Sequence, residues 1–208
     1  MANYKKVNKT GLKAMVNSLK EFEELQSKYG LTGIQCIREL KDTIIGVECG
    51  VDMINKDQDD FDGYKSDTGD HYENKNVGLR SKKIICTFPD LPANKIDTLE
   101  KENTILTVSV WDGVVDPKFV LIGNGKNVAG IIRKKWNKID PKRRKSVTLS
   151  YKELVDGGFD VVLMDSTFDE FINTIREKYP SKKAPNRRMP EVWARGSMKS
   201  VVAKQMNA

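Results

Sequence analysis

The sequence predicts an α/β protein with a mixed central β-sheet flanked by helices. In several segments apolar residues recur every three or four positions, which is typical of amphipathic helices, and short β-branched or apolar runs lie between them. Such an alternation favours an α/β fold. With 208 residues, of which 38% are hydrophobic, the chain is long enough to bury one core. We therefore expect a single α/β domain over residues 1–179 and a basic arm or tail over residues 180–208.

The first part of this domain, residues 10–42, is expected to be helical. Thr10 is placed as the N-cap of a helix in which apolar residues recur between positions 12 and 25. A shorter helix is expected after Thr32, because apolar residues follow there at a spacing of three. These N-terminal helices precede the strands of the core.

The core, residues 43–179, is expected to begin with a strand at residues 43–49, where β-branched side chains cluster. A hairpin follows, and helices and strands then alternate. The strands are short apolar runs bounded by turn-forming residues, whereas the helices keep the spacing of three and four. The elements expected after the hairpin are a helix at 93–103, strands at 104–111 and 118–122, a helix at 127–139, a strand at 159–164, and a helix at 166–179 capped by Ser166.

The net charge of +7 is unevenly distributed along the chain. Residues 126–145 carry nine positive side chains and one negative, and residues 181–208 carry seven positive and one negative. Residues 57–73 carry seven acids and one lysine instead. Two basic clusters and one acidic segment suit a protein that brings a polyanion to a bound cation. Charge runs are equally typical of solvated surfaces.

Several protein classes are disfavoured by the composition. The apolar runs are far too short to span a membrane, and the first ten residues contain no apolar stretch of the kind found in secretory signals. Cys36, Cys49 and Cys86 are odd in number, and the chain has one histidine, so neither a disulfide framework nor a zinc site is expected. We expect buried cysteines and a reducing, cytoplasmic location.

A β-hairpin is expected where the chain is most acidic. Its strands are residues 61–65 and 71–77, and the turn-forming sequence 66–70 (SDTGD) connects them. Counting back from the turn places Asp62 opposite Glu73. A loop longer or shorter by one residue would shift this pairing, so the register is the weak point of the prediction.

Two carboxylates and an amine converge in this hairpin. Because side chains alternate in a strand, Glu73 and Lys75 face the same side, and the register brings Asp62 to them. Such a group suits Mg²⁺, which takes oxygen ligands from one or two carboxylates and keeps several waters. Asp62 and Glu73 are therefore candidate metal ligands. Lys75 is a candidate to orient or activate the water that attacks a phosphodiester.

Other interpretations of the same segment remain open. Asp60 would replace Asp62 if the register slipped, whereas Asp67 and Asp70 are expected to shape the turn. The hairpin could also be an acidic surface feature whose Glu–Lys pair contributes little. An HNH-like site around His71 would require a ββα unit, and the sequence directly after Val77 (GLRS) does not begin a clear helix. His71 is expected to be exposed or to contact DNA.

Asp62, ten intervening residues and then Glu73-Asn74-Lys75 resemble the signature of the PD-(D/E)XK nuclease superfamily, which includes many type II restriction endonucleases. The expected order of elements is similar as well, over about residues 32–139: N-terminal helices, a hairpin with the acid and the E-x-K strand, a helix and a strand. One departure is that Phe61 stands where the family signature has proline.

The resemblance implies a restriction-endonuclease-like core that cleaves double-stranded DNA. Asp62 and Glu73 would bind Mg²⁺, and Lys75 would assist the attacking water. Symmetric cutting of both strands would imply a homodimer. Enzymes of this kind sometimes place another acid on an early helix, and the acids available here are Glu21, Glu23, Glu24, Glu39 and Glu48. The alternatives are a junction-resolving or repair nuclease of the same fold, and a non-catalytic nucleic-acid-binding protein.

Candidate contacts with DNA lie in the two basic clusters. The residues suited to neutralising phosphates are Lys134, Lys135, Arg143 and Arg144, and those suited to wrapping a duplex from the arm are Arg187 and Arg188. A solvated helix face and a disordered tail are the alternatives. The sequence 123–126 (GNGK) lacks the spacing of a phosphate-binding P-loop, so we expect a strand-to-helix turn there.

Overall fold

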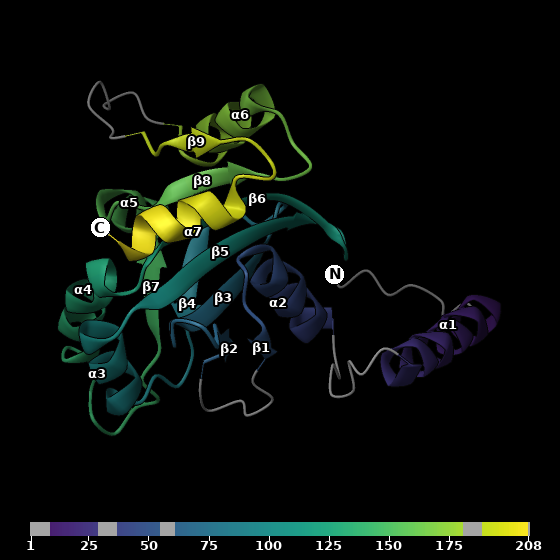
Figure 1. Ribbon diagram of the computed structural model, residues 1–208, viewed down its shortest axis with the longest axis horizontal. Helices are drawn as coiled ribbons and strands as arrows, with labels where there is room; N and C mark the ends of the chain where they lie inside the picture. Colours follow the sequence, from purple (N-terminus) through teal and green to yellow (C-terminus); the bar gives the residue numbers. More distant parts are fainter. Residues whose placement is uncertain (1–8, 29–36, 55–60, 181–188, 208) are drawn as a thin grey trace, which may run out of the picture. The chain divides into compact units, whose positions relative to one another are not determined.

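The computed structural model describes residues 9–28, 37–54, 61–180 and 189–207 (Figure 1). The chain divides into two compact units, Met1–Glu39 and Leu40–Ala208. The first unit contains helix α1 (Lys9–Lys28). Because this helix already includes Lys9, Thr10 lies inside it and is not its N-cap, which corrects the prediction. The second unit contains the sheet and the predicted site.

The predicted α/β fold with a mixed sheet flanked by helices is confirmed. Within the described residues, seven strands form the main sheet in the order β1-β2-β3-β5-β6-β8-β9, and β4 pairs with β7 in a second, two-stranded sheet. The pairs β3–β5 and β8–β9 are parallel, and the others are antiparallel. The elements are α2 (Ile37–Glu48), β1 (Met53–Ile54), β2 (Gly63–Tyr64), β3 (His71–Gly78), β4 (Ile85–Phe88), α3 (Ala93–Lys101), β5 (Thr104–Asp112), β6 (Asp116–Asn124), α4 (Lys126–Trp136), β7 (Val147–Ser150), α5 (Tyr151–Asp156), β8 (Asp160–Leu163), α6 (Phe168–Lys178), β9 (Val192–Trp193) and α7 (Met198–Met206).

The main sheet separates two hydrophobic cores, because its strands are apolar on both faces. Helices α2 and α7 lie across one face, which is the near face in Figure 1. The other face carries α3, α4, α5 and α6 together with the β4–β7 sheet. Successive residues of β5 alternate between the two cores, as Ile105 and Leu106 show. The helix predicted at residues 93–103 is α3, and it buries Ile96 and Leu99.

The strand predicted at residues 43–49 is instead part of helix α2. The buried residues between positions 42 and 49 are Asp42, Ile45, Gly46 and Cys49, at helical spacing, whereas Val47 is 59% exposed. The β-branched side chains therefore misled the prediction, because a propensity of this kind is weak and packing against the sheet overrides it.

The C-terminal segment, predicted as an arm or tail over residues 180–208, contributes to the fold from residue 192 onward. Strand β9 pairs in parallel with β8, and α7 buries Met198, Val201 and Val202. These apolar residues recur at helical spacing, but the basic composition of the segment obscured the pattern. Arg187 and Arg188 lie outside the described residues.

Helix α6 begins one residue later than predicted. Its N-cap is Thr167, whose hydroxyl and the Glu170 carboxylate form a capping box, whereas Ser166 donates to the Lys118 carbonyl at 2.6 Å. Phe168 is 51% exposed. The shift of the cap by one residue moves Phe168 to the first position of the helix, outside the buried stripe.

The GNGK sequence forms the expected turn between β6 and α4, and its glycines are required for packing. A Cβ atom at Gly123 would lie 2.4 Å from the Phe159 ring, and one at Gly125 would lie 2.6 Å from Leu99. Both distances are shorter than real contacts allow. Close approach of neighbouring side chains therefore accounts for these glycines without a bound phosphate.

Gly123→Ala should destabilise the protein by about 1–3 kcal/mol, because Phe159 must move to admit the methyl group. Gly130→Ala is the matched control, since a Cβ atom there meets nothing within 4 Å and alanine favours the α4 helix by about 0.5–1 kcal/mol. Urea denaturation of the two variants measures both effects. Equal midpoints would contradict the packing explanation.

Candidate active site

The hairpin register places the predicted residues as the sequence suggested. In the β2–β3 pair Gly63 lies opposite Tyr72, so Asp62, one residue earlier, lies opposite Glu73. The Asn74 backbone N–H donates to Asp62 Oδ2 at 2.7 Å, which fixes the aspartate against the strand. Lys75 Nζ donates to Glu73 Oε1 from the same face of β3. The structure thus brings Asp62, Glu73 and Lys75 together at one point.

A second lysine, which the sequence did not reveal, completes this group. Lys95 lies in the first turn of α3, and its Nζ is 2.8 Å from Glu73 Oε2. Each carboxylate oxygen of Glu73 therefore faces one ammonium group. Glu73 is almost fully buried, with 1% of its surface exposed, so both ion pairs lie in a region of low dielectric. Only the position of α3 in the crossover from β3 to β5 brings Lys95 here.

The charges of the group shift the pKa values of Asp62 and Lys75. Burial raises the pKa of Asp62 to about 7, and the negative charge of Glu73 adds to this, while Lys75 opposes it. Burial alone would lower the pKa of Lys75, but the charges of Glu73 and Asp62 outweigh it and raise that pKa. Lys75 therefore stays protonated at neutral pH, where Asp62 is poised between its two forms.

Aromatic rings line the group on two sides. Lys95 Nζ lies 4.7 Å from the centre of the Phe61 ring, and Lys75 Nζ lies 5.2 Å from that of Phe88. Phe61 also stacks on His71, with ring centres 4.6 Å apart. The residue that departs from the family signature thus contributes a buried wall that excludes water from Lys95.

A polar network on the opposite face of β3 holds the strand in place. The side-chain amides of Asn74 and Asn76 donate to Asp42 Oδ1 at 2.7 and 2.6 Å, and the hydroxyls of Thr107 and Ser109 donate to Asn74 Oδ1 at 2.8 and 3.0 Å. Asp42, on α2, was absent from the acids predicted for an early helix. It contacts the strand from behind, and the candidate Glu48 is exposed.

The remaining hairpin residues have structural contacts. Thr68 Oγ1 donates to Asp70 Oδ2 at 2.6 Å, and exposed Asp67 lies 3.7 Å from Lys65, so both acids have contacts within the hairpin. His71 is half-buried, and its Nε2 lies 2.9 Å from Glu102, which differs from the exposed position expected. Asp60 lies outside the described residues.

The cysteines do not supply a nucleophile in the described part of the chain. Cys49 and Cys86 are buried, as predicted, whereas Cys36 lies outside the described residues. Burial raises the pKa of Cys86 to about 12 and that of Cys49 further still. Because the thiolate is the reactive form, both side chains act as small hydrophobic residues at neutral pH.

The donor set fits Mg²⁺. In the described residues no cluster of three or more His, Cys, Asp or Glu side chains could hold a metal ion. Mg²⁺ is commonly bound by only one or two carboxylates with waters in its other positions, and Asp62 and Glu73 provide two. Burial and the neighbouring Glu73 raise the pKa of Asp62, because both disfavour its negative charge. A divalent cation would compensate it.

Two of the four described candidates for DNA contact are engaged in ion pairs. Lys135 Nζ lies 2.7 Å from Glu153 and donates to the Thr148 carbonyl at 2.7 Å, and Arg144 pairs with Asp90. Lys134 and Arg143 are exposed. The basic cluster is therefore partly a set of structural ion pairs, and its exposed members are the ones suited to a phosphate.

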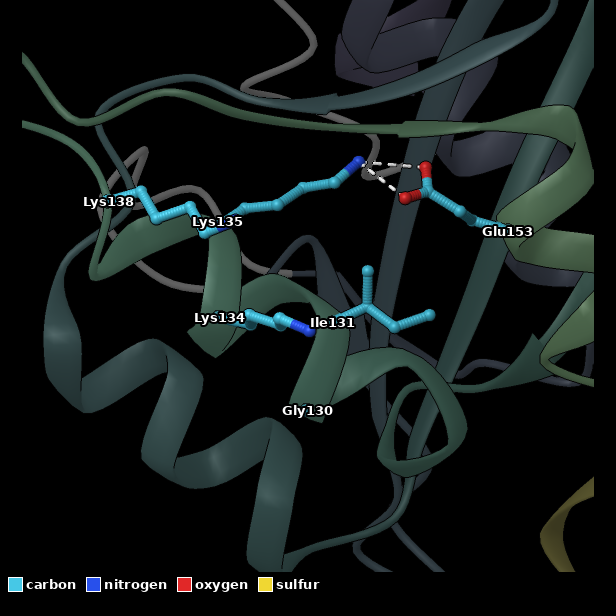
Figure 2. Close-up of a pocket in the computed structure, with 6 residues that line it drawn as sticks. All are labelled: Gly130, Ile131, Lys134, Lys135, Lys138 and Glu153. Atoms are coloured by element: carbon cyan, nitrogen blue, oxygen red, sulfur yellow. Dashed lines mark hydrogen bonds and ion pairs between the residues drawn. The ribbon is translucent and has the colours of Figure 1, made fainter.

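A groove beside α4 collects part of this basic cluster. Figure 2 shows the Lys135 ammonium reaching the Glu153 carboxylate across the groove. The residues that line it are Gly130, Ile131, Lys134, Lys135, Lys138 and Glu153. Exposed Lys134 lies in the last turn of α4, and exposed Lys138 lies just beyond the end of this helix, so the groove presents a positive rim to solvent.

No protein-family model matches the chain, and no curated protein matches it. Among the described helices, none is long and apolar enough to cross a lipid bilayer. The function is therefore inferred from the geometry and charge of the site.

Proposed function

We propose that the protein is a Mg²⁺-dependent endonuclease that hydrolyses phosphodiester bonds in double-stranded DNA, of the type II restriction endonuclease kind. The observation that carries this proposal is the convergence of Asp62, Glu73 and Lys75 across the β2–β3 hairpin. A buried and a partly buried carboxylate that share one site with two lysines are costly to assemble, because each charge loses contact with water. Such costs are typical of active sites.

Each residue has a role in this proposal. Asp62 and Glu73 would hold the ion, which when bound supplies Lewis-acid stabilisation of the charge that develops on the phosphate. Lys75 is protonated and therefore acts as a donor that orients the attacking water or a phosphate oxygen, rather than as a base. Phe61 and Phe88 limit water around the two lysines and strengthen these interactions.

The order of elements supports the resemblance to PD-(D/E)XK nucleases. Helix α2, the hairpin β2–β3, helix α3 and strand β5 come in this order along the chain, with β1 before the hairpin and β4 before α3. Strand β5 pairs in parallel with the strand that carries Glu73 and Lys75. An HNH-like site is disfavoured, since the element after β3 is strand β4 rather than a helix.

The proposal is tested by incubating the purified protein with plasmid and long linear DNA in the presence of Mg²⁺ or EDTA. Discrete fragments that require Mg²⁺ are the expected result. Intact DNA that is only retarded on a gel would support a non-catalytic nucleic-acid-binding protein instead. Cleavage confined to four-way junctions would indicate a junction-resolving nuclease. A homodimer in solution, measured by light scattering, is expected for symmetric cutting.

The exposed basic residues should control the salt dependence of DNA binding. Exchange of Lys134 and Arg143 for alanine should weaken binding and lower the slope of log affinity against log salt by up to about 2, at about 0.9 for each lost phosphate contact. Lys199→Ala is the control, because this exposed lysine lies on α7 at the other face of the sheet. Fluorescence anisotropy from low to moderate salt measures the slopes. Equal slopes for this variant and for Lys199→Ala would show that Lys134 and Arg143 do not contact DNA phosphates.

A further inference from the structure

Glu73 is held by two lysines, although one ammonium suffices for a nuclease site of the proposed kind. Lys75 comes from the next position on the same face of β3 and contacts Oε1. Lys95 comes from α3 and contacts Oε2 at 2.8 Å. An ion bound by Glu73 needs at least one of these oxygens. A divalent cation bound by Glu73 would therefore compete with a lysine for the charge of this carboxylate.

The position of Lys95 in its helix is unfavourable by itself. It lies in the first turn of α3, where the helix dipole disfavours positive charge, and no acidic residue of that turn compensates it. The N-cap, Pro92, makes no side-chain cap hydrogen bond. The contact with Glu73 and the face of Phe61 thus provide the stabilisation that retains the ammonium at this site.

We propose that Lys95 is a built-in counter-ion that occupies the place of the divalent cation at Glu73 in the metal-free protein and is displaced when the cation binds. This inference rests on the proposed function of the site. Lys75 remains beside Glu73 Oε1 in both states, whereas Lys95 swings away on its four-carbon side chain. The lysine thereby keeps a buried carboxylate paired in the metal-free protein, and it weakens metal binding by competition.

Competition between Lys95 and the cation should change the apparent dissociation constant of the metal by a measurable factor. When a binding-competent state is populated only in part, the apparent dissociation constant rises by the inverse of that fraction. If Lys95 holds Glu73 nine-tenths of the time, its removal tightens metal binding about tenfold. Lys95→Met removes the charge but keeps an unbranched apolar chain against Phe61. Lys95→Gln is the second variant, should the first fail to fold.

The experiment is a calorimetric titration of the DNA-free protein with Mn²⁺, which shares the oxygen ligands of Mg²⁺ and binds more tightly. The titration is run at pH 8 on the wild type, Lys95→Met, Lys101→Met and Glu73→Gln. Lys101 is exposed in the last turn of the same helix and serves as the matched control. We expect Lys95→Met to bind at least about tenfold more tightly than Lys101→Met. We also expect the metal-free Lys95→Met protein to unfold at lower urea concentration, with Mn²⁺ restoring its stability.

The outcomes separate the two proposals. Binding by the wild type that Glu73→Gln abolishes, together with equal affinities of Lys95→Met and Lys101→Met, would overturn the counter-ion role and leave the nuclease proposal intact. Weaker binding by Lys95→Met would also overturn it, because the lysine would then support the metal rather than compete with it. Absence of binding in both the wild type and Lys95→Met would overturn both.

Discussion

Glu73→Gln and Lys75→Ala should each lower the rate of Mg²⁺-dependent DNA cleavage by at least ~10²-fold, the scale observed when a principal electrostatic group of an active site is removed. Glutamine cannot supply the negative charge that a divalent ion needs at the buried end of the hairpin. Alanine at position 75 removes the only ammonium that contacts Glu73 from its own strand. Single-turnover cleavage of plasmid DNA measures both losses, and a gel-shift assay should show that DNA binding persists.

Two variants from the same part of the fold control for general damage. Asp67→Asn changes an acid in the turn of the hairpin whose side chain is 70% exposed, and Lys101→Ala changes an exposed lysine of α3. Both should cleave at the wild-type rate. Circular dichroism checks that Glu73→Gln and Lys75→Ala remain folded. If the folded variants keep their activity, Asp62, Glu73 and Lys75 are not the active site, even though the protein cleaves DNA.

The part of the site that can be predicted from sequence is the hairpin, because its determinants are local. The turn-forming residues 66–70 set the loop length, and Gly69 adopts the positive φ of 73° that the turn requires. With the loop length set, strict alternation along β3 determines that Glu73 and Lys75 share a face and that Asp62 lies opposite Glu73.

Lys95 and Asp42 could not be predicted in this way, because their positions depend on contacts far apart in the sequence. Lys95 reaches Glu73 only because α3 crosses between two parallel strands, and its local sequence resembles any solvated helix turn. Asp42 lies directly before residues 43–49, whose β-branched composition predicts a strand, and only the packing of this segment on the sheet reveals that the helix continues through it. Local sequence patterns determine which face of a strand a side chain occupies and how the two strands of a hairpin pair. The packing of helices on the sheet determines which side chains from distant segments come into contact.

The basic clusters show the same limit for charge. Nine positive side chains within residues 126–145 predict a polyanion surface, yet several of these are paired with acids that lie elsewhere in the chain. Arg133 pairs with Asp97 and Glu100 of α3, and Lys135 pairs with Glu153 of α5. The number of charged residues can be read from the sequence, but only the fold determines which of these side chains face solvent. Exposed ion pairs contribute little to the free energy of unfolding, so substitutions that remove them should change the stability of the protein only slightly.

Asp62→Asn should stabilise the protein at neutral and alkaline pH, in contrast to most substitutions at a partly buried position. The pKa of Asp62 is raised from 3.8 to about 7, mainly by burial and then by Glu73, so the folded protein binds this proton more tightly than the unfolded chain does. The stabilisation from the neutral carboxyl is complete below about pH 4 and is lost as the pH rises through about 7. Asparagine is neutral throughout and can still accept the hydrogen bond from the Asn74 backbone.

The size of this effect follows from the pKa values, since each pKa unit corresponds to about 1.4 kcal/mol. The stability advantage of Asp62→Asn should therefore grow by about 2–3 kcal/mol between pH 5 and pH 8, as measured by urea denaturation at each pH. Asp67→Asn, in the exposed turn, should show no such growth. Mg²⁺ at about 100 times its dissociation constant should return about 2.7 kcal/mol to the wild type at pH 8. It should return much less to Asp62→Asn. An acidic surface hairpin without a metal site predicts the opposite pattern, in which neither the pH nor Mg²⁺ distinguishes the two aspartates.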